Sequence, residues 1–335
     1  MEGVNTSKTA VVLFNLGGPD RPEAVQPFLF NLFNDKAIIG APGPIRWLLA
    51  KYISKKRAPI ARDIYAHLGG GSPLLPQTQA QVRALEQALG EGYRCFIAMR
   101  YWHPFAHEAA RAIKDWGAER VILLPLYPQF STTTTGSSVT DWHRAAKDCG
   151  LDLPTSLVCC YPTQAGLVAA MAELARTGYD EAKAKGVPRV LFSAHGLPKK
   201  IVERGDPYQA QVELTARAVS AAMGIEGLDW SICYQSRVGP MEWIGPSTEA
   251  ELERAARDKV PVVIVPVAFV SEHSETLVEL DIEYRHRADQ LGIPGYVRVP
   301  ALGCHTGFIQ GLAQVALHPS RGEACGRLGR SCASC

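Results

Sequence analysis

The sequence predicts an α/β protein built from two doubly wound lobes with parallel sheets. Short apolar runs alternate with helically periodic segments along nearly the whole chain, which is the pattern of parallel strands covered by helices on both faces. The 335 residues suffice for one large domain or two ordinary ones. No internal repeat of the length found in solenoid proteins is present, so two lobes are favoured over a repeat array.

Seven apolar runs bounded by turn-forming residues are predicted as strands. The run 260–270 is nearly free of polar side chains, so it predicts a strand buried on both faces. The seven strands are 10–16, 94–99, 121–126, 157–160, 190–193, 230–234 and 260–270. Between or after them, apolar residues recur at helical spacing in 77–89, 105–116, 164–186, 208–223 and 306–317.

The chain divides into a first lobe, 1–162, a second lobe, 163–318, and a cysteine-rich tail, 319–335. The last helix of the second lobe can pack on the first. The tail is rich in Gly, Ser and Arg without apolar periodicity, so it cannot bury a core of its own. Its three thiols, Cys325, Cys332 and Cys335, suggest a metal staple that takes one further ligand from the body. Incidental cysteines in an unstructured tail are the alternative.

Composition excludes several classes of protein. Lys plus Arg number 35 and Asp plus Glu 33, so no overall field favours nucleic acid. The amino terminus lacks the features of a signal or transit peptide, which predicts a cytoplasmic protein. The longest apolar run is about half of the ~20 residues that span a bilayer. The glycine-rich turns match neither G-x-G-x-x-G nor G-K-[ST], so no nucleotide site is predicted.

The segment 271–285 is unusually acidic and directly follows the buried strand 260–270. Wound as an α-helix, it places four glutamates on one side: Glu272, Glu275, Glu279 and Glu283. Leu277, Leu280 and Tyr284 fall on another side and can face a core. Because parallel α/β sheets bind ligands at the carboxyl ends of their strands, His273 and Glu275 can face a cleft that handles a divalent metal. A merely solvated acidic face is the alternative.

Other candidate residues also follow predicted strands or lie in mixed apolar and basic segments. His195 reaches the same sheet edge as His273, and its imidazole suits proton acceptance near neutrality. Trp243 either lines an apolar slot or caps a core. Arg100 and Tyr101 suit the binding of a carboxylate. Residues 28–65 mix apolar and basic side chains, which predicts contact with a membrane surface or ordinary helix packing.

Several long motifs in order resemble the ferrochelatase family. They are LFNLGGPD, GGGSP, MRYWHP, YPQFSTTTTGSS, FSAHGLP, CYQSRVGPMEWIGPSTE and VAFVSEHSETLVELDIEYR, and they run from about residue 11 to residue 317. The resemblance implies two Rossmann-like lobes with a porphyrin cleft between them. It also implies insertion of ferrous iron into protoporphyrin IX, the last step of haem synthesis, with iron and porphyrin as substrates and no nucleotide.

The same resemblance assigns roles to individual residues. His195 is implied to accept pyrrole protons, with Glu275 as its partner across the macrocycle centre, both facing the iron. Glu272, His273, Glu279 and Glu283 are implied to form a path for metal or protons. Contacts to the porphyrin are implied for Leu16, Arg57, Tyr65, Ser72, Arg100, Tyr101, Trp243 and Phe269.

Some ferrochelatases hold a 2Fe-2S cluster, and the tail resembles the part that binds it. Cys325, Cys332 and Cys335 match three ligands, whereas Thr132 stands where the animal enzymes supply the fourth. Cys159 or Cys160 is the expected substitute, ahead of Cys149 and Cys304. Two other functions remain as alternatives: a chelatase for another tetrapyrrole, and a haem or metal carrier without turnover. The sequence also leaves open whether the protein is a monomer or a homodimer.

Overall fold

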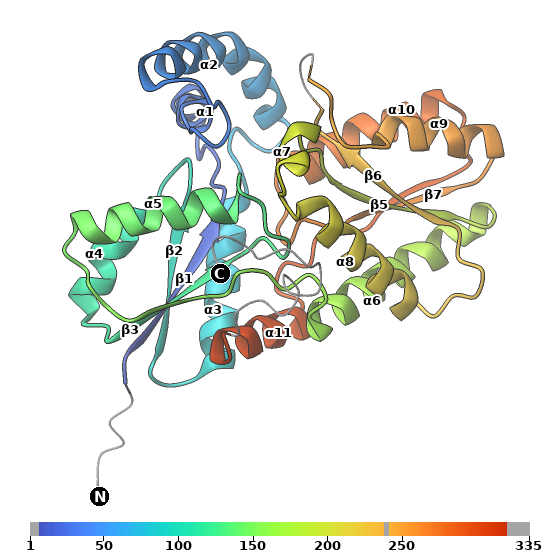
Figure 1. The fold of residues 1–335 in the computed structure, drawn as a ribbon. Coiled ribbons are helices and arrows are strands. Elements are labelled where there is room, and N and C mark those ends of the chain that lie inside the picture. The colour runs from blue at the N-terminus through green and yellow to red at the C-terminus, as the bar shows by residue number, and fades with distance from the viewer. Residues whose placement is uncertain (1–6, 238–240, 320–335) are drawn as a thin grey trace, which may run out of the picture. The chain divides into compact units, whose positions relative to one another are not determined.

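The computed structural model describes residues 7–237 and 241–319, which divide into two units (Figure 1). Residues 7–160 and 312–319 belong to the first unit, and 161–237 and 241–311 to the second. Each unit carries one four-stranded sheet whose paired strands all run parallel. The predicted α/β class with two parallel sheets is thereby confirmed.

The first unit is built on a sheet of order β2-β1-β3-β4. Its strands are β1 (Thr9–Asn15), β2 (Tyr93–Met99), β3 (Arg120–Pro125) and β4 (Thr155–Leu157). A 3-10 turn, Pro22–Ala24, leads into α1. The helices are α1 (Val25–Phe33), α2 (Gly43–Ala66), α3 (Leu74–Leu89), α4 (Ala106–Trp116) and α5 (Thr135–Asp148).

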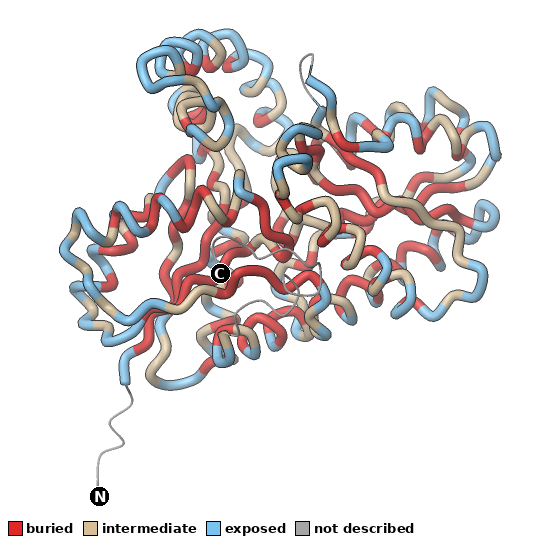
Figure 2. The backbone as a smooth tube through the Cα atoms, viewed as in Figure 1, coloured by how far each residue is buried: buried red, intermediate tan, exposed pale blue. Residues whose placement is uncertain are grey.

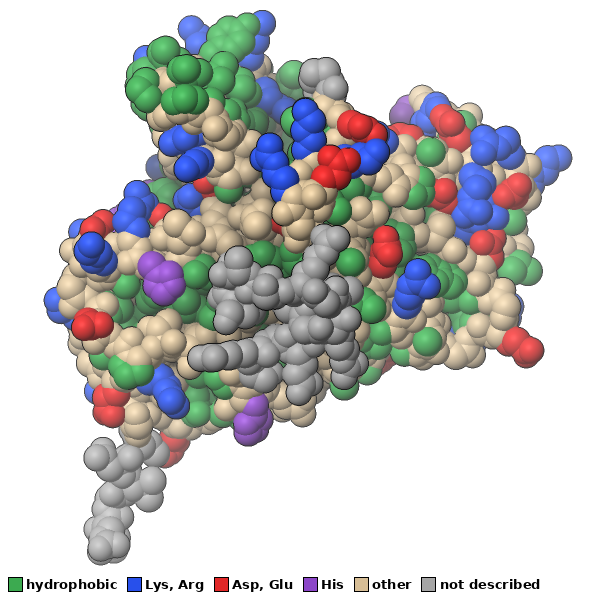
Figure 3. Space-filling model, viewed as in Figure 1, with side chains coloured by type: hydrophobic (Ala, Val, Ile, Leu, Met, Phe, Trp, Pro, Cys, Tyr) green, Lys and Arg blue, Asp and Glu red, His purple; other side chains and the backbone are tan. Residues whose placement is uncertain are grey.

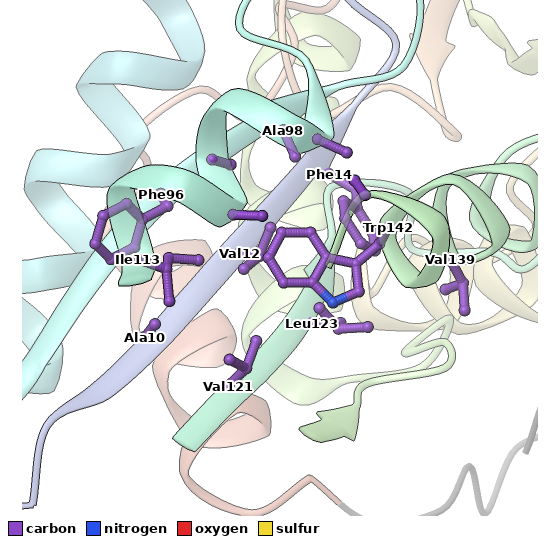
Figure 4. Packing of buried hydrophobic residues seen from close by; sticks show 14 residues of the cluster. Ala10, Val12, Phe14, Phe96, Ala98, Ile113, Val121, Leu123, Val139 and Trp142 are labelled. Atoms are coloured by element: carbon purple, nitrogen blue, oxygen red, sulfur yellow. The ribbon is translucent and has the colours of Figure 1, made fainter. Parts of the chain in front are cut away.

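Every residue of β1 is buried, because its apolar side chains face packed layers on both sides of the sheet. One side is shown in Figure 4, where Val12 and Phe14 of β1 lie against Trp142 of α5 and Ile113 of α4. The rings of Phe14 and Trp142 are 6.3 Å apart. Burying each such side chain stabilises the fold by about 1.5–3 kcal/mol. This packing fixes the sheet edge from which the loops of the unit emerge.

The second unit repeats the arrangement with the order β6-β5-β7-β8. Its strands are β5 (Arg189–His195), β6 (Trp230–Gln235), β7 (Val262–Pro266) and β8 (Tyr296–Arg298). Its helices are α6 (Ala165–Ala182), α7 (Lys199–Glu203), α8 (Tyr208–Ala222), α9 (Thr248–Asp258) and α10 (Tyr284–Gln290), with a 3-10 turn at Lys183–Lys185 and a π-helix at Glu275–Glu283. The last helix, α11 (Thr306–Leu317), belongs to the second unit up to residue 311 and to the first unit from residue 312. Figure 2 shows the strands of both sheets as mostly buried.

Three strand predictions differ from the structure. The predicted strand 157–160 shares only Leu157 with β4, because the ladder that β4 forms with β3 covers Thr155–Leu157 and ends there. β7 is shorter than the predicted 260–270, because the chain turns after Pro266, where the Phe269 amide donates to the Pro266 carbonyl at 3.2 Å. β8 was not predicted, because three residues are too few to show alternation. The strand exists through its ladder with β7, in which Val262 pairs with Tyr296.

The prediction of one α-helix over 271–285 is wrong. Residues Glu275–Glu283 form a π-helix, and α10 continues it. Glu272 lies before the helix, so the four glutamates do not share one helical arc. Side chains satisfy three carbonyls of the π-helix: Gln235 donates to Glu275, Tyr296 to Leu280 and Arg285 to Asp281. Leu280 and Tyr284 reach the core of the unit as predicted, whereas Leu277, predicted with them, is only half-buried.

Candidate functional site

The strands β5, β6 and β7 of the second unit deliver polar side chains to one carboxyl edge. His195 is the last residue of β5, and its side chain is 42% exposed. Its Nδ1 lies 2.6 Å from the Gly196 carbonyl oxygen. Since that oxygen can only accept, Nδ1 carries the proton and Nε2 of the neutral ring keeps its lone pair. His195 is thus set up to take a proton on Nε2.

Glu275 opens the π-helix between two imidazoles. Its Oε1 is 3.7 Å from His195 Nε2, and its Oε2 is 3.6 Å from His273 Nε2. Burial by itself would raise the pKa of Glu275, but the positive charge of His195 when its ring is protonated, together with the hydrogen bond and charge of His273, lowers that pKa to about 2. The carboxylate therefore stays ionised and can stabilise an imidazolium on either side.

Aromatic side chains flank these groups within the unit. Trp243 lies over Gly196, where an added Cβ would come within 3.2 Å of the indole. The ring of Phe269 is 4.9 Å from that of His273. Among the described residues, His273 Nδ1 and Trp243 Nε1 are buried without a hydrogen-bond partner. The structure therefore brings together His195, Glu275, His273, Trp243 and Phe269, all of them predicted.

Glu279 is held at the end of β6 by residues that the sequence analysis did not assign. Its two oxygens accept from the Ser236 amide at 2.7 Å, the Ser236 hydroxyl at 2.5 Å and Gln235 Nε2 at 3.0 Å. Ser236 has a φ of 60°, a left-handed conformation that is uncommon outside glycine. Burial and the charge of Glu275 raise the pKa of Glu279, against these hydrogen bonds. Gln235 and Ser236 directly follow the predicted strand 230–234, and this position is the sequence feature from which their role could have been predicted.

Glu272 and Glu283 lie in different surroundings. Glu272 accepts from Arg298 at 2.6 Å, from the Ala301 amide at 2.9 Å and from the Thr276 hydroxyl at 2.5 Å. Thr276 also accepts from the His273 amide at 3.0 Å. Glu272 therefore braces the start of the π-helix, and Glu283 lies exposed at its end.

The predicted porphyrin-contacting residues of the first unit fall into a buried and an exposed group. Tyr65 and Tyr101 are buried in one cluster, with Leu16 packed against it. Arg57 is exposed and lies over the Phe33 ring. Ser72 is half-buried, and a Cβ on Gly18 would come within 2.5 Å of it.

Arg100 and Tyr101 belong to a charged network that the sequence analysis missed. Asp35 accepts from the Tyr101 hydroxyl at 2.8 Å and pairs with Arg100 at 2.9 Å. The Ser137 hydroxyl bridges Arg100 and Asp35: it accepts from Arg100 Nε at 2.7 Å and donates to Asp35 at 2.5 Å. Although burial raises the pKa of Asp35, the bonds from Ser137, Ala37, Arg100 and Tyr101 lower it overall. The Tyr101 hydroxyl therefore donates its hydrogen to the buried carboxylate of Asp35.

Cysteines that could hold a cluster are only partly within the described residues. Cys159 and Cys160 follow β4 and are buried in one cluster with Phe130. Adjacent thiols in such a setting are chemically suitable iron-sulfur ligands. Cys325, Cys332 and Cys335 lie outside the described residues. Within 7–237 and 241–319, no group of three His, Cys, Asp or Glu side chains forms a metal site.

Helix α2 exposes large apolar side chains, most of them in its first half. Figure 3 shows hydrophobic side chains gathered over this helix, with Lys and Arg beside them. The exposed members are Ile45, Trp47, Leu48, Leu49, Tyr52 and Ile60. Lys51 lies 5.0 Å from the Trp47 ring and Lys56 5.1 Å from the Tyr52 ring. No helix in the described ranges combines the length and apolar character needed to cross a bilayer.

Comparisons with known proteins agree with one another along the chain. A family model described as ferrochelatase matches residues 8–319. The ferrochelatase of Caulobacter vibrioides is 54% identical over 332 residues, covering 98% of this chain and 94% of the relative. That of Phenylobacterium zucineum is 54% identical over 315 residues, covering 92% and 91%. A Wolbachia ferrochelatase is 50% identical, covering 93% and 99%.

Solved structures resemble the fold at low sequence identity. SirB from Bacillus subtilis with Fe3+ has a TM-score of 0.52 at 14% identity, covering 94% of this chain and 98% of that one. The sirohydrochlorin chelatase SirB in complex with cobalt has a TM-score of 0.53 at 11% identity, covering 95% and 97%. At such identities the likeness concerns the fold alone.

Proposed function

We propose that His195 and Glu275 are the catalytic residues of this chain, which belongs to the ferrochelatase family and is a ferrochelatase of haem synthesis. Both residues lie near the carboxyl edge of the second sheet. The reaction places ferrous iron in protoporphyrin IX and releases two protons from the pyrrole nitrogens. It needs a base near the metal centre, and we assign the enzyme to the lyases. The single observation that supports these roles is the Nε2 of His195 facing an ionised Glu275 at 3.7 Å.

The proposed mechanism begins with proton transfer from a pyrrole nitrogen to His195 Nε2. The Nδ1–H of the ring remains bonded to the Gly196 carbonyl, so protonation of Nε2 gives an imidazolium. Glu275 stabilises that cation through its negative charge, and His273 holds the other carboxylate oxygen. Each of the two pyrrole protons leaves its nitrogen by this transfer in turn, and the two freed nitrogens then bind iron together with the other two ring nitrogens. After each transfer the proton leaves His195 along a polar path that we propose for His273, Glu279 and Glu283, with Glu272 bracing its start.

Porphyrin binding is proposed for residues of both units. In the second unit, Trp243 and Phe269 offer apolar surface next to His195 and His273. In the first unit, we propose contacts from Leu16, Arg57, Tyr65, Ser72, Arg100 and Tyr101. Arg100 keeps a 20% exposed side chain, so its guanidinium is the better candidate for a substrate carboxylate than the fully buried Tyr101.

Replacing His195 tests the function and the role together. Purified wild-type protein should convert protoporphyrin IX and ferrous iron under anaerobic conditions, followed as loss of free-base porphyrin fluorescence. His195→Ala should lose at least about a hundredfold in kcat and retain porphyrin binding. His286→Ala removes an exposed imidazole that contacts Gln290 and should behave as wild type. If the wild type binds protoporphyrin IX without converting it, the protein is a carrier. If it inserts cobalt into sirohydrochlorin faster than iron into protoporphyrin IX, it is a chelatase for another tetrapyrrole.

We also propose a 2Fe-2S cluster held by Cys325, Cys332, Cys335 and one of Cys159 and Cys160. When bound, the cluster would tie the tail to the body or report redox state. Cys335→Ser should remove the visible absorption bands of the purified protein. Of Cys159→Ser and Cys160→Ser, one should do the same, whereas Cys304→Ser, at an exposed position, should keep the bands. A colourless wild-type protein after anaerobic iron and sulfide reconstitution would reject the cluster.

Finally, we propose that the enzyme works in the cytoplasm with peripheral contact to a membrane through residues 28–65. The exposed apolar side chains of α2 and the neighbouring lysines support this surface. Apolar side chains can enter the boundary of the bilayer while lysines bind anionic lipid headgroups.

A further inference from the structure

A buried hydroxyl lies between two carboxyl groups behind the site. Tyr284 begins α10 directly after the π-helix, and the residue is only 6% exposed. Its hydroxyl oxygen is 3.3 Å from Glu279 Oε1 and 3.1 Å from Glu249 Oε1. Glu249 is exposed in the first turn of α9. One hydroxyl therefore connects a carboxyl group of the site with one in solvent.

The Tyr284 hydroxyl lies within hydrogen-bond distance of two carboxyl groups but has a single hydrogen. A tyrosine hydroxyl has one hydrogen, so it can donate to only one of the two carboxylates at a time. The second contact is a hydrogen bond only when that carboxyl is protonated and donates to the tyrosine oxygen. The titratable groups that face Tyr284 are Glu279 of the π-helix, Glu249 of α9 and Cys233 of β6. The geometry thus suits a proton shared along the row Glu279, Tyr284 and Glu249.

Glu279 is linked to the reacting centre through Gln235. Gln235 Nε2 donates both to the Glu275 carbonyl and to Glu279, which fixes the two glutamates relative to each other. The charge on Glu275 and burial both raise the pKa of Glu279, so a proton is more readily held there than on an exposed glutamate. Ser236 holds the carboxyl in place through its amide and hydroxyl.

We propose that the exit path divides at Glu279, and that the Tyr284 hydroxyl forms its main branch, beside the one through Glu283, by passing the protons released by metal insertion from Glu279 to Glu249, where they enter solvent. The proposal rests on the roles given above to His195, Glu275 and Glu279. The O–H bond of protonated Glu279 breaks as its proton moves to the Tyr284 oxygen, while the tyrosine's own proton moves to the Glu249 carboxylate. Tyr284 stays neutral, Glu249 loses its proton to water, and rotation of the hydroxyl resets the relay.

Such a relay answers a need of the reaction. Each turnover releases two protons, and a site that retained them could not accept those of the next porphyrin. Tyr284 is buried and Glu279 is half-buried, which limits direct exchange with water, so a fixed hydroxyl leading to an exposed carboxylate offers a route. Tyr284 is buried and is not among the residues proposed above to contact a substrate, so it is a relay residue that acts through Glu279.

Replacing the hydroxyl by hydrogen tests the relay. Tyr284→Phe keeps the ring in the core and should lower kcat at least about tenfold, with KM for both substrates unchanged. The solvent deuterium isotope effect on kcat should rise, and imidazole buffer at increasing concentration should restore part of the rate. Glu249→Gln, at the surface, should show the same isotope effect and buffer rescue even if the core variant folds poorly.

Tyr296→Phe is the matched control. Tyr296 is a buried tyrosine of the same cluster, and its hydroxyl donates to the Leu280 carbonyl of the π-helix and to neither carboxylate. It should show no buffer rescue and no change in isotope effect. Equal kcat, isotope effect and buffer response in Tyr284→Phe and Tyr296→Phe would overturn the relay while the wild type still inserts iron. Lack of turnover by the wild type would instead reject the proposed function.

Discussion

At the scale of single residues, the site depends on how neighbours set the charge of each group. Glu275 keeps its charge because two imidazoles lie at its two oxygens, whereas Glu279, four residues on, is pushed towards its protonated form by burial and by that same charge. The two carboxyls therefore suit different tasks: one stabilises a cation and the other holds a proton.

Glu275→Gln should make the protein less sensitive to acid. A pKa lowered from 4.5 to about 2 means that Glu275 stabilises the fold above pH 4.5 and that this contribution is lost as pH falls from 4.5 to about 2. The wild type should lose up to about 3 kcal/mol more than Glu275→Gln between pH 5 and pH 2. Urea unfolding of both proteins across this range measures the difference, and parallel curves would contradict the assigned pKa.

At the scale of elements, the start of the π-helix is fixed by a buried ion-pair network. Arg298 of β8 pairs with Glu272 at 2.6 Å and with Asp281 at 2.9 Å, and its side chain is 9% exposed. Through Thr276, the same network reaches the backbone of His273. A three-residue strand at the sheet edge thus positions residues of the site.

Arg298→Gln should destabilise the second unit by about 3 kcal/mol, because two carboxylates lose their buried partner. Arg285→Gln is the control: Arg285 also pairs with Asp281 at 2.9 Å, but its side chain is 44% exposed, so the loss should stay below about 1 kcal/mol. Denaturant unfolding monitored by tryptophan fluorescence gives both values. Similar losses in the two variants would show that burial of Arg298 is unimportant.

Helix α6 and the beginning of α11 approach each other through glycine. A Cβ on Gly166 of α6 would come within 2.2 Å of the Gly307 carbonyl oxygen of α11. Because backbone must move to make room, Gly166→Ala should cost about 1–3 kcal/mol. Gly43→Ala, at the start of α2 with open space around it, should be neutral or stabilise by up to about 1 kcal/mol. Thermal unfolding of the two variants distinguishes them, and an unchanged Gly166→Ala would contradict the close packing.

At the scale of the whole molecule, the fold and the chemistry have separate origins. Proteins at 11–14% identity share the fold, whereas the ferrochelatases at 50–54% identity match nearly the whole chain. The parallel sheets bring loops to a common edge, and the residues placed there decide the reaction.

The proposed membrane contact through α2 can be tested on the intact protein by changing one exposed leucine. Leu48 is 62% exposed on α2, and Leu48→Asp should weaken binding to vesicles of phosphatidylcholine and phosphatidylglycerol about tenfold, since burying a leucine is worth roughly 1.5–3 kcal/mol. Val187→Asp changes a 68% exposed residue of the second unit and should bind as wild type. Co-sedimentation measures both, and equal binding would exclude α2 as the contact surface.

The sequence by itself determined the α/β class, six of the eight strands, one residue of a seventh, β4, and the sheet edge at which His195 ends β5. Apolar periodicity and strand-end position are local properties, so they can be read along one chain. Only the tertiary structure decided the π-helix, β8, the pairing of Glu272 with Arg298 and the sharing of Tyr284 by Glu279 and Glu249. These depend on contacts between segments distant in sequence, whose hydrogen bonds and charges outweigh local helical preference.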